Sequence, residues 1–352
     1  MGNEDLPVSD NHAAKARAEP LLDTTLLSPT IRWSAIVLSI TVGYLLLALL
    51  PLLWPGWWFA DLLANLRIQL VIAAVVLALG LLLNGCWKTF LLLVLLTAYH
   101  VSWFVMPTAV SRTDATLPGT ITVMAANVFT NNQNYDQIER QFRDSECDIV
   151  AVSELSFGLA KHLQDSFVTD YPHFIEFPAD RGNFGIGMYS RLPLDNASIE
   201  FLTDDSIPTV IGDVQAGEKT FHIVGVHTLP PIGRQNFEHR NRHLDLIAKH
   251  VKQQKEQAAD TAVIVMGDFN LTPWSPVFTT FLNDSQLNQT TAGGPFQPTW
   301  YRWPAFPFGL VLDHVLLSDQ LVCVSRTIGD SVGSDHRFVT VNVGWDSMGL
   351  GK

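Results

Sequence analysis

The chain has 352 residues, of which 47% are hydrophobic, and a formal net charge of −12. A mean hydropathy of +0.19 indicates a membrane part and argues against a soluble protein of ordinary composition. The charge is uneven: six basic and six acidic residues balance through Arg112, so residues 113–352 carry the entire net charge. This acidity argues against broad non-specific binding of duplex DNA, although it leaves a local basic patch open.

The first part of the chain is apolar apart from its start. Residues 1–31 are polar and small and predict a mobile tail. Three apolar runs follow at Trp33–Trp54, Ile68–Leu83 and Thr89–Met106, and each approaches the length that crosses a hydrocarbon core of about 30 Å. Three transmembrane helices within residues 32–107 are therefore expected. A cleavable signal peptide fits poorly, because the first run is long and two more follow; buried helices of a soluble protein are the other alternative.

Charges beside these runs predict the orientation. The second run reaches back to Leu62 if Arg67 snorkels or faces a neighbouring helix. Three crossings place the termini on opposite sides, and the positive-inside tendency places the tail in the cytoplasm. The cationic residues on the tail side outnumber those on the other side, Lys15, Arg17, Arg32 and Lys88 against Arg67 and Arg112. We thus expect a multi-pass protein of the inner (plasma) membrane with a periplasmic or extracytoplasmic catalytic domain.

After a polar linker at residues 108–119, strand-like and helix-like segments alternate up to a short tail at residues 347–352. The expected strands lie at residues 121–129, 147–155, 184–191, 221–226 and 262–268, and the expected helices at 135–145 and 236–254. Periodicity alone predicts a domain of the α/β or α+β class over residues 120–346.

Polar side chains recur where these apolar segments end. They come from six separate segments: Asn127, Glu154, His227, Asp268 with Asn270, Asp313, and Asp335 with His336. A strand that ends in Asp-x-Asn is also an ordinary start of a turn, but six such ends are hard to assign to six independent turns. Carboxylates and amides suit Mg²⁺ or Mn²⁺, and the lack of paired cysteines disfavours a structural zinc site. The pattern favours phosphate chemistry.

The same segments resemble the endonuclease/exonuclease/phosphatase superfamily, which has the DNase I-like fold. The resemblance covers residues 121–343 and rests on six motifs in the family's order: AAN, SEL, GVHTLPP, MGDFN, LDHVLLS and GSDHRFV. It implies a four-layer α/β sandwich in which two mixed, largely antiparallel sheets pack face to face with helices outside. The expected fold is this sandwich preceded by three transmembrane helices.

By this resemblance, one group of residues would hold a divalent metal ion, Mg²⁺ or Mn²⁺. Glu154 would ligate the ion, Asn127 would lie close by, and Asp335 would complete or extend the site. Whether one or two metal ions act stays open.

The resemblance assigns the remaining residues to the reaction. Asp268 would orient or deprotonate the attacking water, and Asn270 would hold the phosphate or the nucleophile. His336, oriented by Asp313, would stabilise developing charge or act as the acid, and His227 would bind a phosphate oxygen. Phosphoryl transfer needs such groups, because charge on the equatorial oxygens must be neutralised while water attacks in line.

Two further segments have open interpretations. Arg234, with Arg240 and Arg242, forms either a solvated helix face or an anion-binding patch that contacts substrate. The aromatic residues between Trp300 and Phe308 form either a packed loop or a hydrophobic wall that faces lipid or a base ring.

The sequence thus predicts a membrane-anchored, divalent-metal-dependent phosphoesterase, and most simply a phosphodiesterase. A membrane-proximal substrate, such as a phospholipid or a lipid-linked phosphodiester, gains from tethering beside the bilayer. The alternative is an endonuclease or exonuclease acting on DNA or RNA. A catalytically idle membrane scaffold is the hypothesis from a different class.

Overall fold

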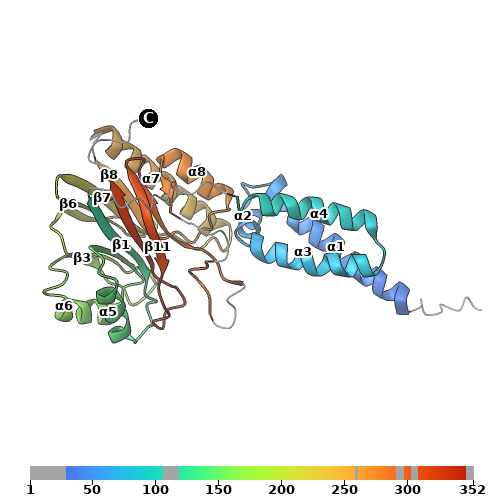
Figure 1. Cartoon of the computed structure of the whole chain (residues 1–352), viewed down its shortest axis with the longest axis horizontal. Coiled ribbons are helices and arrows are strands. Elements are labelled where there is room, and N and C mark those ends of the chain that lie inside the picture. The colour runs from blue at the N-terminus through green and yellow to red at the C-terminus, as the bar shows by residue number, and fades with distance from the viewer. Residues whose placement is uncertain (1–28, 106–118, 258–260, 291–296, 303–307, 346–352) are drawn as a thin grey trace, which may run out of the picture.

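The computed structural model describes residues 29–105, 119–257, 261–290, 297–302 and 308–345. Most of the expected tail and linker, and all of residues 347–352, lie outside these ranges, as do Trp303 and Phe306 of the aromatic segment. Within them, a group of four helices and an α/β domain lie end to end along the long axis of the molecule (Figure 1).

Two six-stranded sheets form the centre of the α/β domain. The first has the order β11 (Leu321–Ile328), β12 (Val339–Trp345), β1 (Gly119–Asn127), β2 (Ile149–Ser153), β4 (Ile186–Ser190) and β3 (His173–Phe177). The second has the order β5 (Leu194–Glu200), β6 (Thr209–Ala216), β7 (Lys219–His227), β8 (Ala262–Asp268), β10 (Asp313–Leu317) and β9 (Asn288–Gln289). Neighbouring strands are antiparallel except for β1 with β2 and β7 with β8, so both sheets are mixed.

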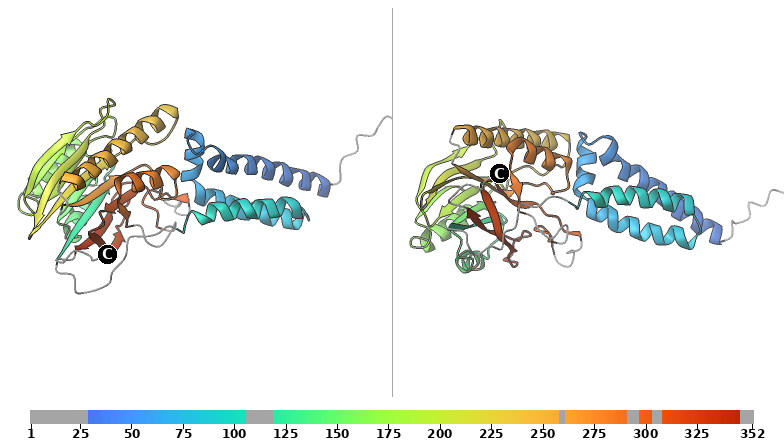
Figure 2. Two further views of the ribbon diagram at one scale, coloured as in Figure 1. Left: turned by 90° about the horizontal axis from the view of Figure 1, so that it is seen from above. Right: turned by 45° about the horizontal axis from the view of Figure 1, so that its top comes forward.

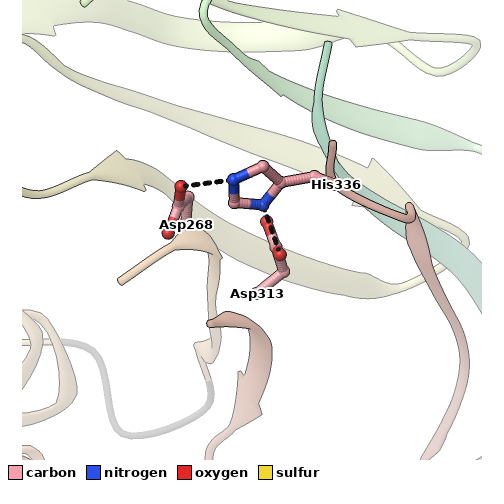
Figure 3. Close-up of side chains that lie close together, drawn as sticks. All are labelled: Asp268, Asp313 and His336. Carbon is pink, nitrogen blue, oxygen red and sulfur yellow. Dashed lines mark hydrogen bonds and ion pairs between the residues drawn. The ribbon is translucent and has the colours of Figure 1, made fainter. Parts of the chain in front are cut away.

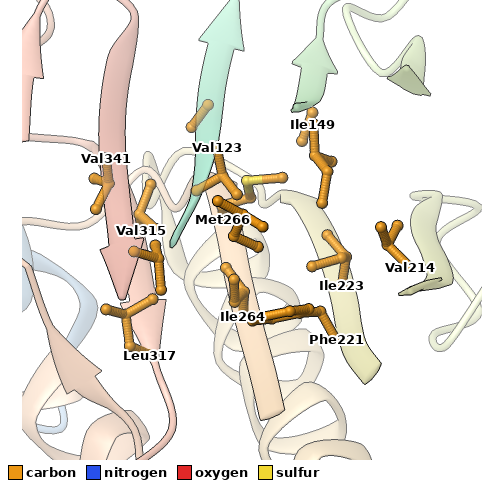
Figure 4. Packing of buried hydrophobic residues seen from close by; sticks show 14 of the residues in the cluster. Val123, Ile149, Val214, Phe221, Ile223, Ile264, Met266, Val315, Leu317 and Val341 are labelled. Atoms are coloured by element: carbon orange, nitrogen blue, oxygen red, sulfur yellow. The ribbon is translucent and has the colours of Figure 1, made fainter. Parts of the chain in front are cut away.

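Hydrophobic clusters on both faces of each sheet define four layers. Between the sheets, alternate residues such as Val123, Ile223 and Ile264 interdigitate (Figure 4). The opposite face of β8 presents Val263 and Val265 to α7 (Arg234–Gln257) and α8 (Pro276–Ser285). Helices α5 (Tyr135–Asp144) and α6 (Phe157–Ser166) cover the outer face of the first sheet. Burial on both faces explains why β8 is a continuous apolar run, and the expected two-sheet sandwich is confirmed.

The N-terminal helices are α1 (Pro29–Leu53), α2 (Trp58–Asn65), α3 (Arg67–Leu83) and α4 (Trp87–Ser102). Of the residues described, only Trp33–Leu53 forms a single helix long and apolar enough to cross a membrane, and α2 with α3 would form a second span only if the two count as one. Helix α4 has 16 residues, or about 24 Å at 1.5 Å per residue. Three independent crossing helices are therefore not established.

The second apolar run is not one helix. Helices α2 and α3 meet at Leu66 with a bend of 73°. Arg67 does not snorkel to solvent: it is fully buried and bonds to His100 of α4 and to the backbone of Trp274 in the α/β domain. The two views in Figure 2 show α2 where the helices join that domain. The bend therefore coincides with the polar contacts that join the helices to the α/β domain.

Helices α1, α3 and α4 pack on one another through a small apolar cluster that includes Ala48, Leu81 and Leu93. Their outward faces carry most of the exposed large hydrophobic side chains of the described residues, among them Ile40, Val76 and Leu95. An apolar surface of this extent indicates an interaction with an apolar environment.

Candidate active site

Three neighbouring strands of the second sheet bring polar residues to one edge. Asp268, the last residue of β8, lies opposite His227 at the end of β7 and opposite Asp313 at the start of β10. Parallel β7 and β8 end together, and antiparallel β10 begins at the same edge. The strand register therefore accounts for the proximity of three side chains that are far apart in sequence.

Asn127 joins this row to the first sheet. It ends β1 beside Ser153 of β2, and Glu154 follows directly. Its amide Nδ2 donates to Oδ2 of Asp268 at 2.9 Å and to Oε1 of Glu154 at 3.1 Å. One buried amide therefore connects a carboxylate of each sheet.

Asp268 lies at the centre of the cluster. Its Oδ2 is 3.6 Å from Nε2 of His227 and 3.6 Å from Nε2 of His336, so both imidazoles point at one carboxylate oxygen (Figure 3 draws the His336 pair). Burial raises the pKa of Asp268 above its ordinary value, while the imidazoles of His336 and His227 act in the opposite direction. A buried carboxylate whose pKa is raised is a stronger base, so Asp268 can accept a proton from water.

His336 and Asp313 form a hydrogen-bonded pair. Nδ1 of His336 is 2.8 Å from Oδ2 of Asp313, which fixes the ring so that Nε2 faces Asp268. Burial alone lowers the pKa of His336, but the carboxylates of Asp313 and Asp268 outweigh that effect and raise the pKa to about 10. The imidazole is thus held as a cation that can donate from Nε2.

Asn270 shapes the turn after β8. Its φ of 46° is in the left-handed region that asparagine tolerates better than most residues. Its backbone N–H donates to Oδ1 of Asp268 at 2.8 Å, and its Nδ2 donates to the carbonyl of Thr228 at 2.8 Å. Asn270 therefore orients Asp268. The turn after β8 is part of the active site because its backbone holds the carboxylate of Asp268 in place.

Glu154 has the surroundings of a metal ligand. It is 9% exposed, accepts hydrogen bonds from the backbone and hydroxyl of Thr130, and forms no ion pair with a lysine or arginine in the part of the chain described. A buried carboxylate without a cationic partner is costly, and a hard divalent cation would compensate its charge. The two carboxylate oxygens of Glu154 are ligands of the kind that Mg²⁺ or Mn²⁺ takes.

Asn127 differs from its expected role beside the metal. Its NH₂ group faces the two carboxylates, and its Oδ1 accepts the N–H of Phe129 at 3.1 Å. In this orientation Asn127 holds the carboxylates together and presents no free oxygen to a cation.

A second arrangement of ligand atoms also exists in the cluster. One atom each of Asp268, Asp313 and His336 lie within 4.8 Å of one another. In this arrangement Nδ1 of His336 is already 2.8 Å from Oδ2 of Asp313, so two of the three groups bond to each other.

Asp335 borders the cluster, because its charge acts on His336, whereas Arg234 lies away from it. Oδ2 of Asp335 accepts from the indole N–H of Trp300 at 3.2 Å and is 3.6 Å from Arg302, and no contact with Glu154 accompanies these among the described residues. The Arg234 side chain is 81% exposed and pairs with Glu238 on its own helix. The structure does not bring Arg234 to Asp268, and a solvated helix face describes it better than a substrate-binding patch.

Several short polar residues that sequence reasoning did not single out complete the site. Ser334 donates to the carbonyl of Asn127 and accepts the N–H of His336, and the hydroxyl of Thr299 accepts the N–H of Asp313. Ser334 lies in the GSDHRFV motif, which was the one available signal.

The two-sheet sandwich carries at its facing strand ends an Asp–Asn–His–Asp cluster and a buried glutamate that pairs with no lysine or arginine among the described residues, which is an arrangement suited to phosphoester chemistry. The comparisons agree: residues 124–336 match the model of the Endonuclease/Exonuclease/phosphatase family. The chain belongs to that family, whose members are hydrolases of phosphoesters, so the expected enzyme class is confirmed.

Solved structures show the same fold at low identity. An endonuclease/exonuclease/phosphatase from Beutenbergia cavernae is 17% identical with a TM-score of 0.53, covering 64% of this chain and 72% of that one. D. rerio TDP2 complexed with single strand DNA product is 15% identical with a TM-score of 0.52, covering 64% and 99%. A beta toxin mutant from Staphylococcus aureus with bound magnesium ions is 18% identical with a TM-score of 0.51, covering 65% and 100%. None of the curated protein sequences matches the chain.

Proposed function

We propose that the chain is a membrane-anchored phosphodiesterase that uses Mg²⁺ or Mn²⁺ and hydrolyses a phosphodiester by attack of water. The carboxylate of Asp268 carries the proposal, because it meets the amide of Asn127 and the imidazoles of His227 and His336 at one oxygen. This arrangement supplies a proton acceptor and two nitrogen donors within one small volume.

Each residue of the cluster would have its own task in the reaction. Glu154, extended by Asp335, would hold the cation, which neutralises charge on the phosphate oxygens when bound. Asp268 would orient the water and accept its proton, with Asn270 fixing the carboxylate by its N–H. His227 would donate to a phosphate oxygen, and His336, held by Asp313, would donate from Nε2 to the oxygen that gains charge.

The helices support membrane anchoring. We propose that α1, α3 and α4 lie in the inner membrane within residues 32–107, that α2 lies at its surface against the catalytic domain, and that residues 120–346 form this domain outside the cytoplasm. The exposed apolar side chains on α1, α3 and α4 would then face lipid, where their burial is favourable.

The position of α2 supports a membrane-proximal substrate. This helix contacts Thr272 and Trp274, which come shortly after Asp268 and Asn270. A phosphodiester at the bilayer surface, in a phospholipid or a lipid-linked molecule, would meet the site at a high local concentration. A nuclease is the second candidate, supported by the fold shared with a structure that contains a single-strand DNA product.

Hydrolysis of bis-p-nitrophenyl phosphate by the full-length chain in detergent tests the activity. We expect turnover with Mg²⁺ or Mn²⁺, none with EDTA, and a loss of about two orders of magnitude or more for Asp268→Ala, because the proton acceptor is removed. Asp213→Asn, which changes another aspartate of the same sheet that pairs with His222, is the matched control and should retain activity. Metal-independent turnover or a fully active Asp268→Ala enzyme contradicts the proposal. A wild type without turnover would indicate an idle scaffold.

The substrate class is tested by comparing the rates at which the same enzyme cleaves different phosphodiesters. Phospholipid vesicles should be cleaved faster than single-stranded or double-stranded DNA at equal phosphodiester concentration. The reverse preference would establish the nuclease.

A further inference from the structure

Helix α2 is bonded directly to the loop after the catalytic strand β8. Oδ1 of Asn65 accepts the backbone N–H of Thr272 at 2.7 Å and its hydroxyl at 2.9 Å. The indole N–H of Trp274 donates to the backbone carbonyl of Asn65 at 3.1 Å. One asparagine of the membrane-side helices thus receives three hydrogen bonds from a loop that begins one residue after Asn270.

One turn earlier on the same helix, Asp61 holds the far end of this loop. Its Oδ1 accepts the hydroxyl of Ser275 at 2.8 Å, and its Oδ2 pairs with Arg240 of α7 at 2.9 Å. Asp61, Ser275 and Arg240 are all fully buried. Residues Asp61 and Asn65 are four apart, so they lie on one face of α2, and this face is occupied by the catalytic domain.

The start of α3 fixes a second loop. Arg67 donates to the carbonyl of Trp274 at 3.0 Å, and Ile68 packs with Trp274 and Val311 in one hydrophobic cluster. Val311 lies two residues before Asp313. The start of α3 therefore contacts the chain shortly after Asp268 and shortly before Asp313.

The loop depends on these partners because it is closed to solvent. Residues 271–275 are all buried, and the N–H of Thr272 donates to Asn65. A buried donor that loses its acceptor carries the full cost of desolvation, so the loop would move to find water or another acceptor. The turn at Asn270, which orients Asp268 through an N–H, is two residues from that movement.

We infer that Asn65, supported by Asp61, is a positioning residue of the active site: α2 holds the loop at residues 271–275 in place and thereby sets the orientation of Asn270 and Asp268. The expected effect on kcat rests on the proposed function. The expected effect on the 271–275 loop rests on the contacts alone. The membrane-side helices would then be part of the catalytic structure as well as an anchor.

The test compares full-length variants in detergent by two independent measurements. Asn65→Ala removes the acceptor for Thr272, Thr272→Val removes the hydroxyl, and Thr272→Ser keeps it. Asn84→Ala is the matched control, because Asn84 is a partly buried asparagine at the other end of α3 whose side chain bonds within the helices. Turnover of bis-p-nitrophenyl phosphate is measured together with amide hydrogen exchange of a peptide that covers residues 267–275.

For Asn65→Ala we expect kcat to fall about 10- to 100-fold with little change in KM, the scale of a small displacement of catalytic groups. Exchange of the 267–275 peptide should rise, whereas a peptide from β1 should be unchanged. Thr272→Val should show a smaller loss, Thr272→Ser should restore kcat, and Asn84→Ala should match the wild type.

Unchanged exchange of the 267–275 peptide in Asn65→Ala overturns the inference, as does a kcat within about twofold of the wild type in an active enzyme. If Asn65→Ala does not fold, the valine and serine variants of Thr272 decide by the same criteria. A wild type without turnover contradicts the proposed function instead, and exchange alone then decides this inference.

Discussion

A single carboxylate oxygen, Oδ2 of Asp268, has an amide and two imidazoles around it. The amide of Asn127 is within hydrogen-bonding distance, whereas the two imidazoles at 3.6 Å are too far for a direct hydrogen bond. The imidazoles are therefore oriented toward Asp268 but are not hydrogen-bonded to it. Both Nε2 atoms can donate to a substrate oxygen.

Asp313→Asn should reduce kcat by about two orders of magnitude, because the neutral amide no longer holds His336 as an oriented cation. The measurement is steady-state hydrolysis of bis-p-nitrophenyl phosphate by the full-length chain. Asp330→Asn, at an exposed aspartate of the same C-terminal part, is the control. Equal losses in both variants, or none in Asp313→Asn, would remove His336 and Asp313 from the proposed reaction.

Residues at the ends of buried strands were predictable from the sequence. Asn127, Glu154, His227, Asp268 and Asp313 each stop or start an apolar run, and the structure places them at facing strand ends. Ser334 and Thr299 were not predictable in this way, because short hydroxyl residues are common in loops and their partners depend on how the loops pack. The orientation of the Asn127 amide likewise depends on neighbours from both sheets.

Helix α7 shows what a periodic apolar pattern can and cannot predict. Its apolar residues Leu244, Ile247 and Val251 face the second sheet as the helical period predicts. The pattern gave no sign that Arg240 and His243 are buried, because their partners, Asp61 and Thr209, come from distant elements. Buried polar pairs of this kind depend on tertiary contacts and not on local sequence.

His243 should make the α/β domain sensitive to acid. Burial lowers the pKa of His243 from 6.5 to about 4, so between these values the unfolded chain binds a proton that the folded chain does not. The free energy of unfolding should therefore decrease by about 2 to 3 kcal/mol as the pH falls from 6.5 toward 4.

Chemical denaturation of wild type and His243→Gln at pH 7.5 and pH 4.5, followed by fluorescence, isolates this contribution. The wild type should lose more stability on acidification than the variant, which lacks the titrating group. A difference between the two proteins that is the same at both pH values would contradict the assignment.

The whole molecule combines an apolar helical group with an acidic catalytic domain. The two-sheet architecture was implied by the resemblance of six motifs to the family, whereas the division of the second apolar run at Leu66 was not predictable. Hydropathy is averaged over a window, so it does not detect that Asn65 and Arg67 have partners more than 200 residues away.

An alkaline-phosphatase fusion after Arg112 should be active, because the cationic residues Lys15, Arg17, Arg32 and Lys88 favour a cytoplasmic tail and an odd number of crossings. A cytoplasmic reporter fused at the same point serves as the control and should be inactive. An active cytoplasmic reporter would reverse the proposed orientation.

The eight-residue length of α2 limits how this part of the gene can change. Each residue added to a helix rotates the later residues by about 100°, so one insertion between Asp61 and Asn65 would move one of them off the face that meets the catalytic domain. The segment before α2, residues 55–57, makes none of the side-chain hydrogen bonds to the 271–275 loop, so we expect it to vary in length. Insertions and deletions among natural relatives should therefore collect before Trp58 and be absent between Asp61 and Arg67.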